Sequence, residues 1–434
     1  MCTRTAYKCR AYPDPEQAAQ LGRTFGCVRL VWNKTLSARQ DAYRQRGEKT
    51  SYKATDAALT GWKRGQDLAF LSEVSSVPLQ QTLRHQHTAF ANFFAGRAKY
   101  PRFKSRNGRQ SAHYTRSAFR IRGGGLVLAK QTRPLPVAWS WPETDPAALN
   151  PTTVTVSREA DGRWYVTFAV ETEDPEPAPE AGSEVGIDLG VKDFATLSTG
   201  EKIANPRHLH RKAHRLQRYQ RMMARKQRGS HNRRKAKRKV AAAHRKVRHA
   251  RQDFLHKATA RLVREHDVIA IEDLNIRGMT ASARGTMEEP GRNVAQKRGL
   301  NRSVLDAGLG EFRRQLEYKA ARAGRTVAVV DRWFASSKTC SECGYVLAEL
   351  SLGTRFWTCP SCRTRHDRDV NAAKNILAAG RAAAREEISG EAGPPLCDTG
   401  GAHTVGAGAD IRRHGFVLPR SAVKQETGLV RAGP

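Results

Sequence analysis

The sequence predicts an α+β protein with several domains. Its 434 residues suffice for about three domains, each with a buried core. Helical periodicity dominates the first hundred residues, short strand patterns fill residues 113–172, and apolar strands alternate with helices after residue 183. Two Cys-x-x-Cys pairs in the last third of the chain indicate a small metal-bound module.

The composition indicates a polyanionic partner. The chain carries 76 Lys and Arg against 41 Asp and Glu, a formal net charge of +35. An enzyme of small molecules gains nothing from this imbalance, because self-repulsion destabilises its compact state. Nucleic acid is therefore the expected partner. No apolar run reaches the roughly 20 residues of a membrane helix, and the N-terminus lacks the apolar core of a signal peptide, so we expect a cytoplasmic protein without membrane contact.

The first part of the chain is predicted to contain helices between strands. Residues 4–12 form the first expected strand, and apolar residues three and four positions apart from Glu16 onward indicate an amphipathic helix. The following elements are expected to be helices at 38–46, 54–66 and 77–94, a basic loop with aromatic residues at 97–109, and five short strands within 113–172.

An acidic, proline-rich segment at 173–182 is the expected linker to the second part. Residues 207–251 hold 19 Lys or Arg and six His, with no carboxylate between Glu201 and Asp253, and they predict two long basic helices joined near 229–232. The remaining expected elements are strands within 183–200 and at 267–271 and 327–330, helices at 301–324 and from about 370, and a disordered tail at 381–434.

The clustered cysteines predict a structural zinc site. Cys340 and Cys343 form one pair and Cys359 and Cys362 the other, so two tight turns can present four thiolates to one ion. This set suits a closed tetrahedral Zn²⁺ site, and its paired spacing disfavours the alternative of four free or redox cysteines. The sequence assigns no role to the other four cysteines: Cys2, Cys9, Cys27 and Cys397.

Three carboxylates stand beside apolar residues. Asp188 lies within the strand GIDLG, Glu272 ends the strand VIAIE, and Asp369 begins a helix. A carboxylate in such a place is costly unless it binds a cation. If the three converge at one sheet edge, they can hold two Mg²⁺ or Mn²⁺ ions, which activate water for phosphodiester hydrolysis.

Each carboxylate also has an ordinary interpretation. Asp188 can be a turn residue, Glu272 a charge at a strand end, and Asp369 a helix N-cap. Asp273 and Asp367 lie close to two of them and compete for the same assignments.

Four motifs in this order make a family recognisable: GIDLGVKDFATLSTG, IAIEDLNIRGM, SSKTCSECGY with CPSC, and HDRDVNAAKNIL. The sequence resembles the TnpB (OrfB) proteins of bacterial insertion sequences, which are RNA-guided nucleases related to type V CRISPR effectors. The resemblance covers residues 4–380 and is most specific over 185–377.

The resemblance implies a RuvC-type, RNase H-like nuclease domain with an inserted zinc ribbon, and a β-barrel wedge domain with an inserted helical recognition lobe. By motif match its three catalytic carboxylates are Asp188, Glu272 and Asp369, rather than Asp367. The implied boundaries are 183–335 and 366–380 for the nuclease domain, 336–365 for the ribbon, 1–12 and 113–172 for the wedge, and 13–112 for the helical lobe.

The basic helices, residues 207–257, are expected to line a channel for a guide RNA–DNA duplex. The alternative, a solvated helix face, is disfavoured because anions are missing. The expected contacts are Arg225, Lys226, Arg228, Arg233, Arg234, Lys235, Lys237, Arg238 and Lys239. In the basic loop, Tyr100, Arg102, Phe103 and Lys104 either bind bases and backbone or anchor the loop between lobes.

The implied function is RNA-guided DNA cleavage for a transposable element. A guide RNA from the transposon end would select the target, and double-stranded DNA beside a short motif would be opened and cut as single strands. Three alternatives stay open: a nuclease-inactive RNA-guided DNA-binding regulator, an accessory transposase protein, and a non-catalytic zinc-ribbon RNA-binding protein.

Overall fold

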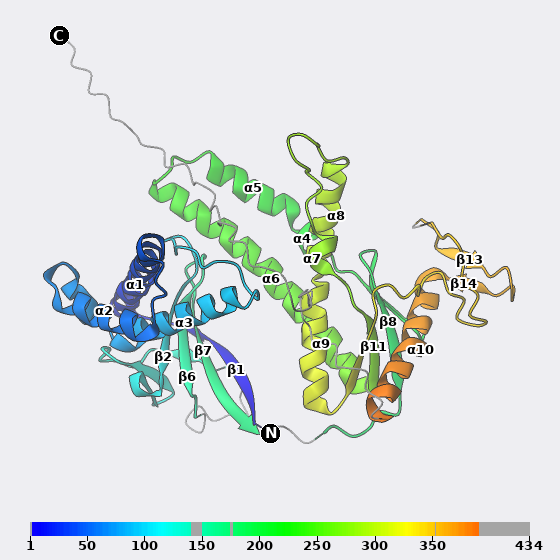
Figure 1. The fold of residues 1–434 in the computed structure, drawn as a ribbon, viewed down its shortest axis with the longest axis horizontal. Helices are drawn as coiled ribbons and strands as arrows, with labels where there is room; N and C mark the ends of the chain where they lie inside the picture. The colour runs from blue at the N-terminus through cyan, green and yellow to red at the C-terminus, as the bar shows by residue number, and fades with distance from the viewer. Residues whose placement is uncertain (1, 140–149, 174–176, 352, 390–434) are drawn as a thin grey trace, which may run out of the picture. The chain divides into compact units, whose positions relative to one another are not determined.

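The computed structural model describes residues 2–139, 150–173, 177–351 and 353–389 (Figure 1). Most of the N-terminal elements up to residue 173 surround one antiparallel sheet, and most elements after residue 177 surround a second, mixed sheet. The strands β13 (Phe356–Thr358) and β14 (Arg365–Asp367) pair separately with each other. Across these described residues, no helix combines the length and apolar content needed to cross a bilayer.

The N-terminal part opens with one strand and one long helix, β1 (Cys2–Ala11) and α1 (Pro15–Arg46). Asp14 starts α1 with a capping box, since its side chain accepts from the Gln17 amide at 2.8 Å and the Gln17 side chain accepts from the Asp14 amide at 3.2 Å. Gly47 ends the helix at φ 68°. The helices expected from Glu16 onward and at 38–46 are therefore one continuous helix.

The helices α2 (Tyr52–Arg64) and α3 (Ser76–Phe94) occupy the predicted ranges to within two residues. Leu21, Phe25 and Val28 on α1 are buried as their spacing predicted, in the same core as Cys9 and Phe168. Cys27 lies in this core too, so two of the unassigned cysteines are packing residues. Burial raises the pKa of the Cys9 thiol to about 11.

The first sheet is open among the described residues, so the expected closed barrel is not formed by its hydrogen bonds. The strand order is β2-β6-β7-β1-β5, and β5 at one edge pairs only two residues of β1. Pro134 and Pro136 beside this edge lack amide hydrogens, which limits pairing there. Residues 140–149 of the expected strand region lie outside the description. The strands are β2 (Gln110–Thr115), β5 (Val137–Ala138), β6 (Thr153–Arg158), β7 (Trp164–Glu173), and the separate hairpin β3 (Phe119–Arg122) and β4 (Gly125–Leu128).

The second sheet has the order β10-β9-β8-β11-β12. The first three strands in this order form an antiparallel meander, and β8, β11 and β12 run parallel. Its strands are β8 (Glu184–Leu189), β9 (Asp193–Leu197), β10 (Lys202–Ala204), β11 (Val268–Glu272) and β12 (Thr326–Val330). All the strand positions expected after residue 183 are therefore present.

Helices cover both faces of the second sheet (Figure 1). Ile269 and Ile271 of β11 pack with α6 (His231–Glu265) and α9 (Leu309–Ala323), whereas Ala270 between them faces α10 (Arg368–Ser389). This alternation is the ordinary consequence of a pleated strand. The strand can be apolar throughout because both of its faces are buried.

The basic run forms the short helix α4 (His208–Arg211) and the two longer helices α5 (Ala213–Ala224) and α6. Residues 225–230 join α5 to α6 and include Gly229, close to the predicted junction. The expected single helix at 301–324 is instead α8 (Val294–Ala307) and α9, because Gly308 between them adopts φ 77°. The prediction of disorder from residue 381 onward is wrong for residues 381–389. The helix α10 continues to Ser389 through an alanine-rich segment of high helix propensity. Residues 390–434 lie outside the description.

The described part of the linker, residues 177–182, is fixed to the second sheet. The amides of Ala181 and Gly182 donate to the Asp267 carboxylate at 2.9 and 2.6 Å. Arg325 donates to the same carboxylate and to the Pro179 carbonyl. These hydrogen bonds lower the pKa of Asp267, because they favour its charged form.

Gly186 on β8 allows α10 to lie directly against the sheet. A Cβ atom at this position would stand 2.1 Å from the Ala373 carbonyl oxygen and 2.6 Å from the Leu377 amide nitrogen. Both are backbone atoms of a helix, so no side chain can rotate away to make room.

We predict that Gly186→Ala lowers the free energy of unfolding by about 3 kcal/mol, at the upper end for overpacking, because the helix backbone must move. Gly22→Ala is the matched control: a Cβ there meets nothing within 4 Å, and alanine favours the helix. Urea denaturation of both variants measures the effect. Equal stability of Gly186→Ala and the parent would contradict the close approach.

Candidate active site and metal centre

Two of the predicted carboxylates lie on adjacent strands. In the parallel ladder between β8 and β11, Ile187 pairs with Ile271, so Asp188 and Glu272 are the next residues along the two strands. Asp369 lies in the first turn of α10, the helix that crosses β8 and β11. Three segments distant in the sequence thus bring their carboxylates to one end of the second sheet.

The three carboxylates interact electrostatically. Burial first, and then the charges of Asp369 and Glu272, raise the pKa of Asp188 to about 7. Burial also raises the pKa of Glu272, with Asp273 contributing. The site therefore disfavours accumulated negative charge, and a bound divalent cation would relieve that cost.

The three carboxylates do not form one compact ligand group in the way the cysteines do. Among the residues that the structure describes, only the four predicted cysteines form a ligand group whose atoms all lie within 4.8 Å of one another. The three carboxylates are therefore neighbours without forming a single compact shell.

The competing acids have other partners. Asp367 caps α10, because its Oδ1 accepts from the Asp369 and Val370 amides at 3.0 and 3.2 Å, and its Oδ2 binds Lys202 Nζ at 2.6 Å. The N-cap role considered for Asp369 thus belongs to Asp367.

Asp273 is occupied as well. Arg313 Nη1 donates to its Oδ1 at 2.6 Å, and Arg332 donates to its Oδ2. Its carboxylate is thereby tied to α9 and to the segment after β12. Asp369 itself has one weaker ion pair, with Arg355 Nη1 at 3.5 Å.

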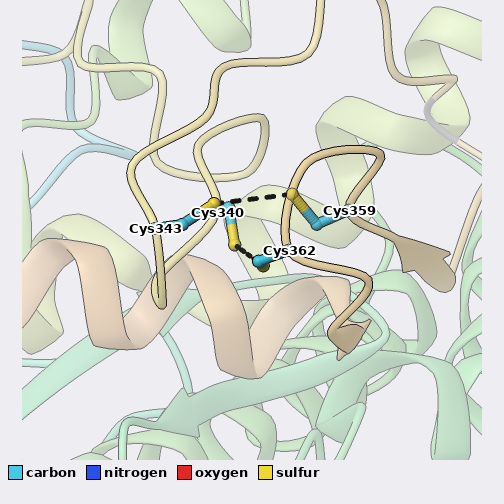
Figure 2. A group of neighbouring side chains, drawn as sticks. All are labelled: Cys340, Cys343, Cys359 and Cys362. Carbon is cyan, nitrogen blue, oxygen red and sulfur yellow. Dashed lines mark hydrogen bonds between the residues drawn. The ribbon is translucent and has the colours of Figure 1, made fainter.

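The four cysteines meet as predicted, from two loops that face each other (Figure 2). The Sγ atoms of Cys340 and Cys362 are 3.6 Å apart, as are those of Cys343 and Cys359. These separations are far beyond a disulfide bond of about 2.05 Å. They are close to the roughly 3.8 Å between two ligands of a tetrahedral ion with Zn–S bonds of about 2.3 Å. The cluster therefore fits zinc.

The thiols have unequal surroundings. Burial raises the pKa of Cys340 to about 11, whereas hydrogen bonds with Thr364 lower the pKa of exposed Cys362 to about 6. His366 Nε2 lies 3.1 Å from Cys340 Sγ, and its ring stands 4.7 Å from that of Trp357. His366, which directly precedes the Asp367 cap, was not among the residues predicted from the sequence.

Two asparagines that the sequence analysis missed link the cysteine loops to α10. Asn371 and Asn375 are both buried, and their Nδ2 atoms each donate to the Thr339 carbonyl at 2.7 Å. Their spacing of four residues on a helix was the available signal, because it places both amides on one face.

The predicted nucleic-acid contacts on the basic helices are largely exposed. Arg233 is the exception among them, since its Nη1 donates to the Met223 and Lys226 carbonyls and closes the turn between α5 and α6. Lys237 Nζ lies 3.3 Å from Asn107 Oδ1. The exposed members are Arg225, Lys226, Arg228, Arg234, Lys235, Lys237, Arg238 and Lys239.

The basic aromatic loop is anchored on α1 and α3. The Tyr100 ring packs edge-on against Phe90 and Phe93 of α3, at 5.5 and 5.2 Å between centroids. Trp32 Nε1 donates to the Arg102 carbonyl at 3.0 Å, and Lys104 Nζ lies 3.9 Å from the centre of the Trp32 ring. Tyr100 and Lys104 thus serve as anchors, while the side chain of Phe103 remains exposed.

Family models match three parts of the chain. Residues 167–283 match the OrfB_IS605 model, described as a probable transposase, and residues 310–376 match a Cas12f1-like TNB domain. Residues 1–48 match a helix-turn-helix domain of the same OrfB group, and here they form β1 and the single helix α1.

Two curated relatives extend over most of the chain. A Streptomyces pristinaespiralis protein is 49% identical over 99% of this chain and 98% of its own length. An Escherichia coli K12 protein is 36% identical over 87% of this chain and 92% of its own. Both are named "Putative RNA-guided DNA endonuclease", the second with the suffix InsQ. A solved Cas12f1-sgRNA-target DNA complex aligns at a TM-score of 0.48 and 13% identity, covering 84% of this chain and 83% of that chain.

We predict that Cys343→Ser removes zinc from the purified protein and lowers its melting temperature, because a hydroxyl is a poorer zinc ligand than a thiolate. Metal analysis should find about one zinc ion per parent chain and much less in the variant. Ser361→Ala, between the two cysteines of the second pair, should keep both properties. Parent protein without stoichiometric zinc would contradict the site.

Proposed function

The chain belongs to the OrfB (TnpB) family of insertion-sequence proteins, and from this membership we propose that it is an RNA-guided DNA endonuclease of a transposable element. The names of its full-length relatives support the activity. The observation that carries the mechanism is the convergence of Asp188, Glu272 and Asp369 from three segments at one end of the second sheet.

Asp188, Glu272 and Asp369 would hold the catalytic Mg²⁺ or Mn²⁺. Their oxygen-only donor set suits these hard cations. When bound, a pair of such ions supplies an activated water and stabilises the leaving oxygen of a phosphodiester. The raised pKa of Asp188 supports this role, because burial and then the charges of Asp369 and Glu272 make its bare carboxylate unfavourable, and a bound cation would offset both. Lys202 pairs with Asp367 and Arg313 pairs with Asp273, so these two neighbouring carboxylates would not be free to bind the catalytic ions.

The domain assignment follows the family pattern. We assign residues 183–335 and 366–380 to an RNase H-like (RuvC) nuclease domain, which the strand order and the direction of its five strands support. Residues 336–365, which carry the four cysteines, would form the inserted zinc ribbon. The wedge would comprise 1–12 and 113–172, built on the first sheet, with helices of 13–112 as the recognition lobe.

The partners would be a guide RNA from the transposon end and the target DNA, first double-stranded and then as separated strands. The exposed Lys and Arg side chains of α5 and α6 support contact with nucleic-acid backbones, because the attraction between a cation and a phosphate does not depend on the base sequence. Base pairing with the guide would supply the sequence specificity.

We predict that Asp188→Ala reduces Mg²⁺-dependent DNA cleavage by more than about 100-fold. Loss of a residue that only supports a metal ligand already costs up to about 100-fold, and Asp188 would itself be a ligand. Target binding should persist, because the backbone contacts remain. Asp253→Asn, an exposed carboxylate paired with Lys257, is the control that should cleave normally. Assays on RNA-loaded protein test this, and undiminished cleavage by Asp188→Ala would refute the assignment.

The basic helices generate a salt-dependence prediction. Replacing Arg234, Lys235 and Arg238 together by Ala should flatten the plot of log affinity against log salt by about 3, since each lost phosphate contact contributes about 0.9. The control replaces Lys257 and Arg264, which already pair with carboxylates on the same helix. Binding titrations across a salt series decide the matter, and an unchanged slope would place the three cations in solvent.

A further inference from the structure

Trp333 is exposed although its backbone is held in place. Its exposed fraction is 86%, whereas Trp32, Trp164 and Trp357 are at most 8% exposed. It lies in the segment DRWFASS, which directly follows β12. A large apolar ring in water is unfavourable, and tryptophan is enriched at binding surfaces, where a partner can cover its ring.

The backbone around Trp333 is well fixed. The Trp333 amide donates to Asp331 Oδ1 at 2.7 Å, and the Phe334 amide donates to the Asp331 carbonyl at 3.1 Å. The next side chain, Phe334, is partly buried and packs against the cluster that contains Val330 and Ile376. One aromatic ring of the pair is therefore partly buried against the core, and the other is presented to solvent.

The segment is also tied to two of the carboxylate-bearing elements. On one side, Arg332 donates to Asp273, the residue after Glu272. The register brings this segment to the same end of the sheet, since Glu272 pairs with Val330. These contacts fix Trp333 to the strand that carries the second catalytic carboxylate.

On the other side, the segment is held by α10. The Ser336 carbonyl accepts from Asn375 Nδ2 at 2.8 Å and, at 3.4 Å, from Asn371 Nδ2. Asn371 is two residues beyond Asp369. The exposed indole is thus carried by a segment anchored at both ends to catalytic elements, so its position relative to Glu272 and Asp369 is set by the fold.

We propose that Trp333 is a stacking platform for an unpaired nucleobase of the DNA strand beside the scissile phosphate. This inference rests on the proposed nuclease function. Base–aromatic stacking tolerates any sequence, because every base has a π face. Only an unpaired and unstacked base offers that face, so Trp333 would favour separated strands over duplex and hold the backbone steady across the carboxylates.

The test uses RNA-loaded protein and single-stranded oligodeoxynucleotides that carry 2-aminopurine at successive positions, with Ca²⁺ in place of Mg²⁺ to prevent cleavage. Stacking on the indole quenches 2-aminopurine fluorescence at one position. Trp333→Ala should abolish this quenching and weaken binding about 5- to 100-fold. Trp333→Phe should retain most of the affinity. Tyr43→Ala, which removes an aromatic ring that is 62% exposed on α1, should change neither.

An abasic site at the quenched position completes a double-mutant cycle. It should weaken binding to the parent and have little further effect on Trp333→Ala. Zinc content and melting temperature of the variants should match the parent, which separates stacking from a structural role. Absence of position-specific quenching, equal loss in Trp333→Phe, or preference for the RNA version of the oligonucleotide would each overturn the proposal. Cleavage by the parent in Mg²⁺ independently reports the nuclease function.

Discussion

The direct contact between the backbone of α10 and the second sheet is the constraint on which the rest of the site depends. Gly186 leaves room for α10 against β8, and Gly380 does the same against Ala270 of β11. Because only backbone and Cβ atoms stand next to the two glycines, the helix start is fixed relative to the strand ends. Asp369 consequently reaches Asp188, and three remote parts of the chain share one electrostatic environment.

The first two turns of α10 also connect the two candidate metal sites. Asp367 caps the helix and Asp369 faces the carboxylates, while Asn371 and Asn375 hold the carbonyl that precedes Cys340. A rearrangement of the cysteine loops would therefore displace the carboxylate site, because the hydrogen bonds of Asn371 and Asn375 lie only a few residues from Asp369. The cysteine cluster thereby holds α10, the helix that carries Asp369 of the carboxylate site, in position.

Local patterns and motifs predicted most of the strands, helices and the cysteine cluster, because those signals lie within short windows. The choice between Asp369 and Asp367 rested on the family motif, and the partners that occupy Asp367 and Asp273, Lys202 and Arg313, lie far away in sequence. The open edge of the first sheet depended on tertiary context, whereas the break at Gly308 had a local signal, because glycine favours the positive φ of a helix end. Trp333 gave no periodic or spacing signal, since only solvent exposure distinguishes it.

The hydrogen bonds that hold residues 177–182 have a consequence for how this protein is divided. The composition of the proline-rich stretch is typical of a flexible linker. In the structure, however, the Asp267 carboxylate accepts hydrogen bonds from the Ala181 and Gly182 amides, and Arg325 donates both to Asp267 and to the Pro179 carbonyl. The second half of the stretch is physically part of the C-terminal half of the chain. A separately expressed C-terminal fragment should accordingly begin near residue 177. A fragment that begins at residue 183 would remove the backbone groups that bind Asp267 and Arg325. Recombination between relatives would be expected to preserve function best upstream of this stretch.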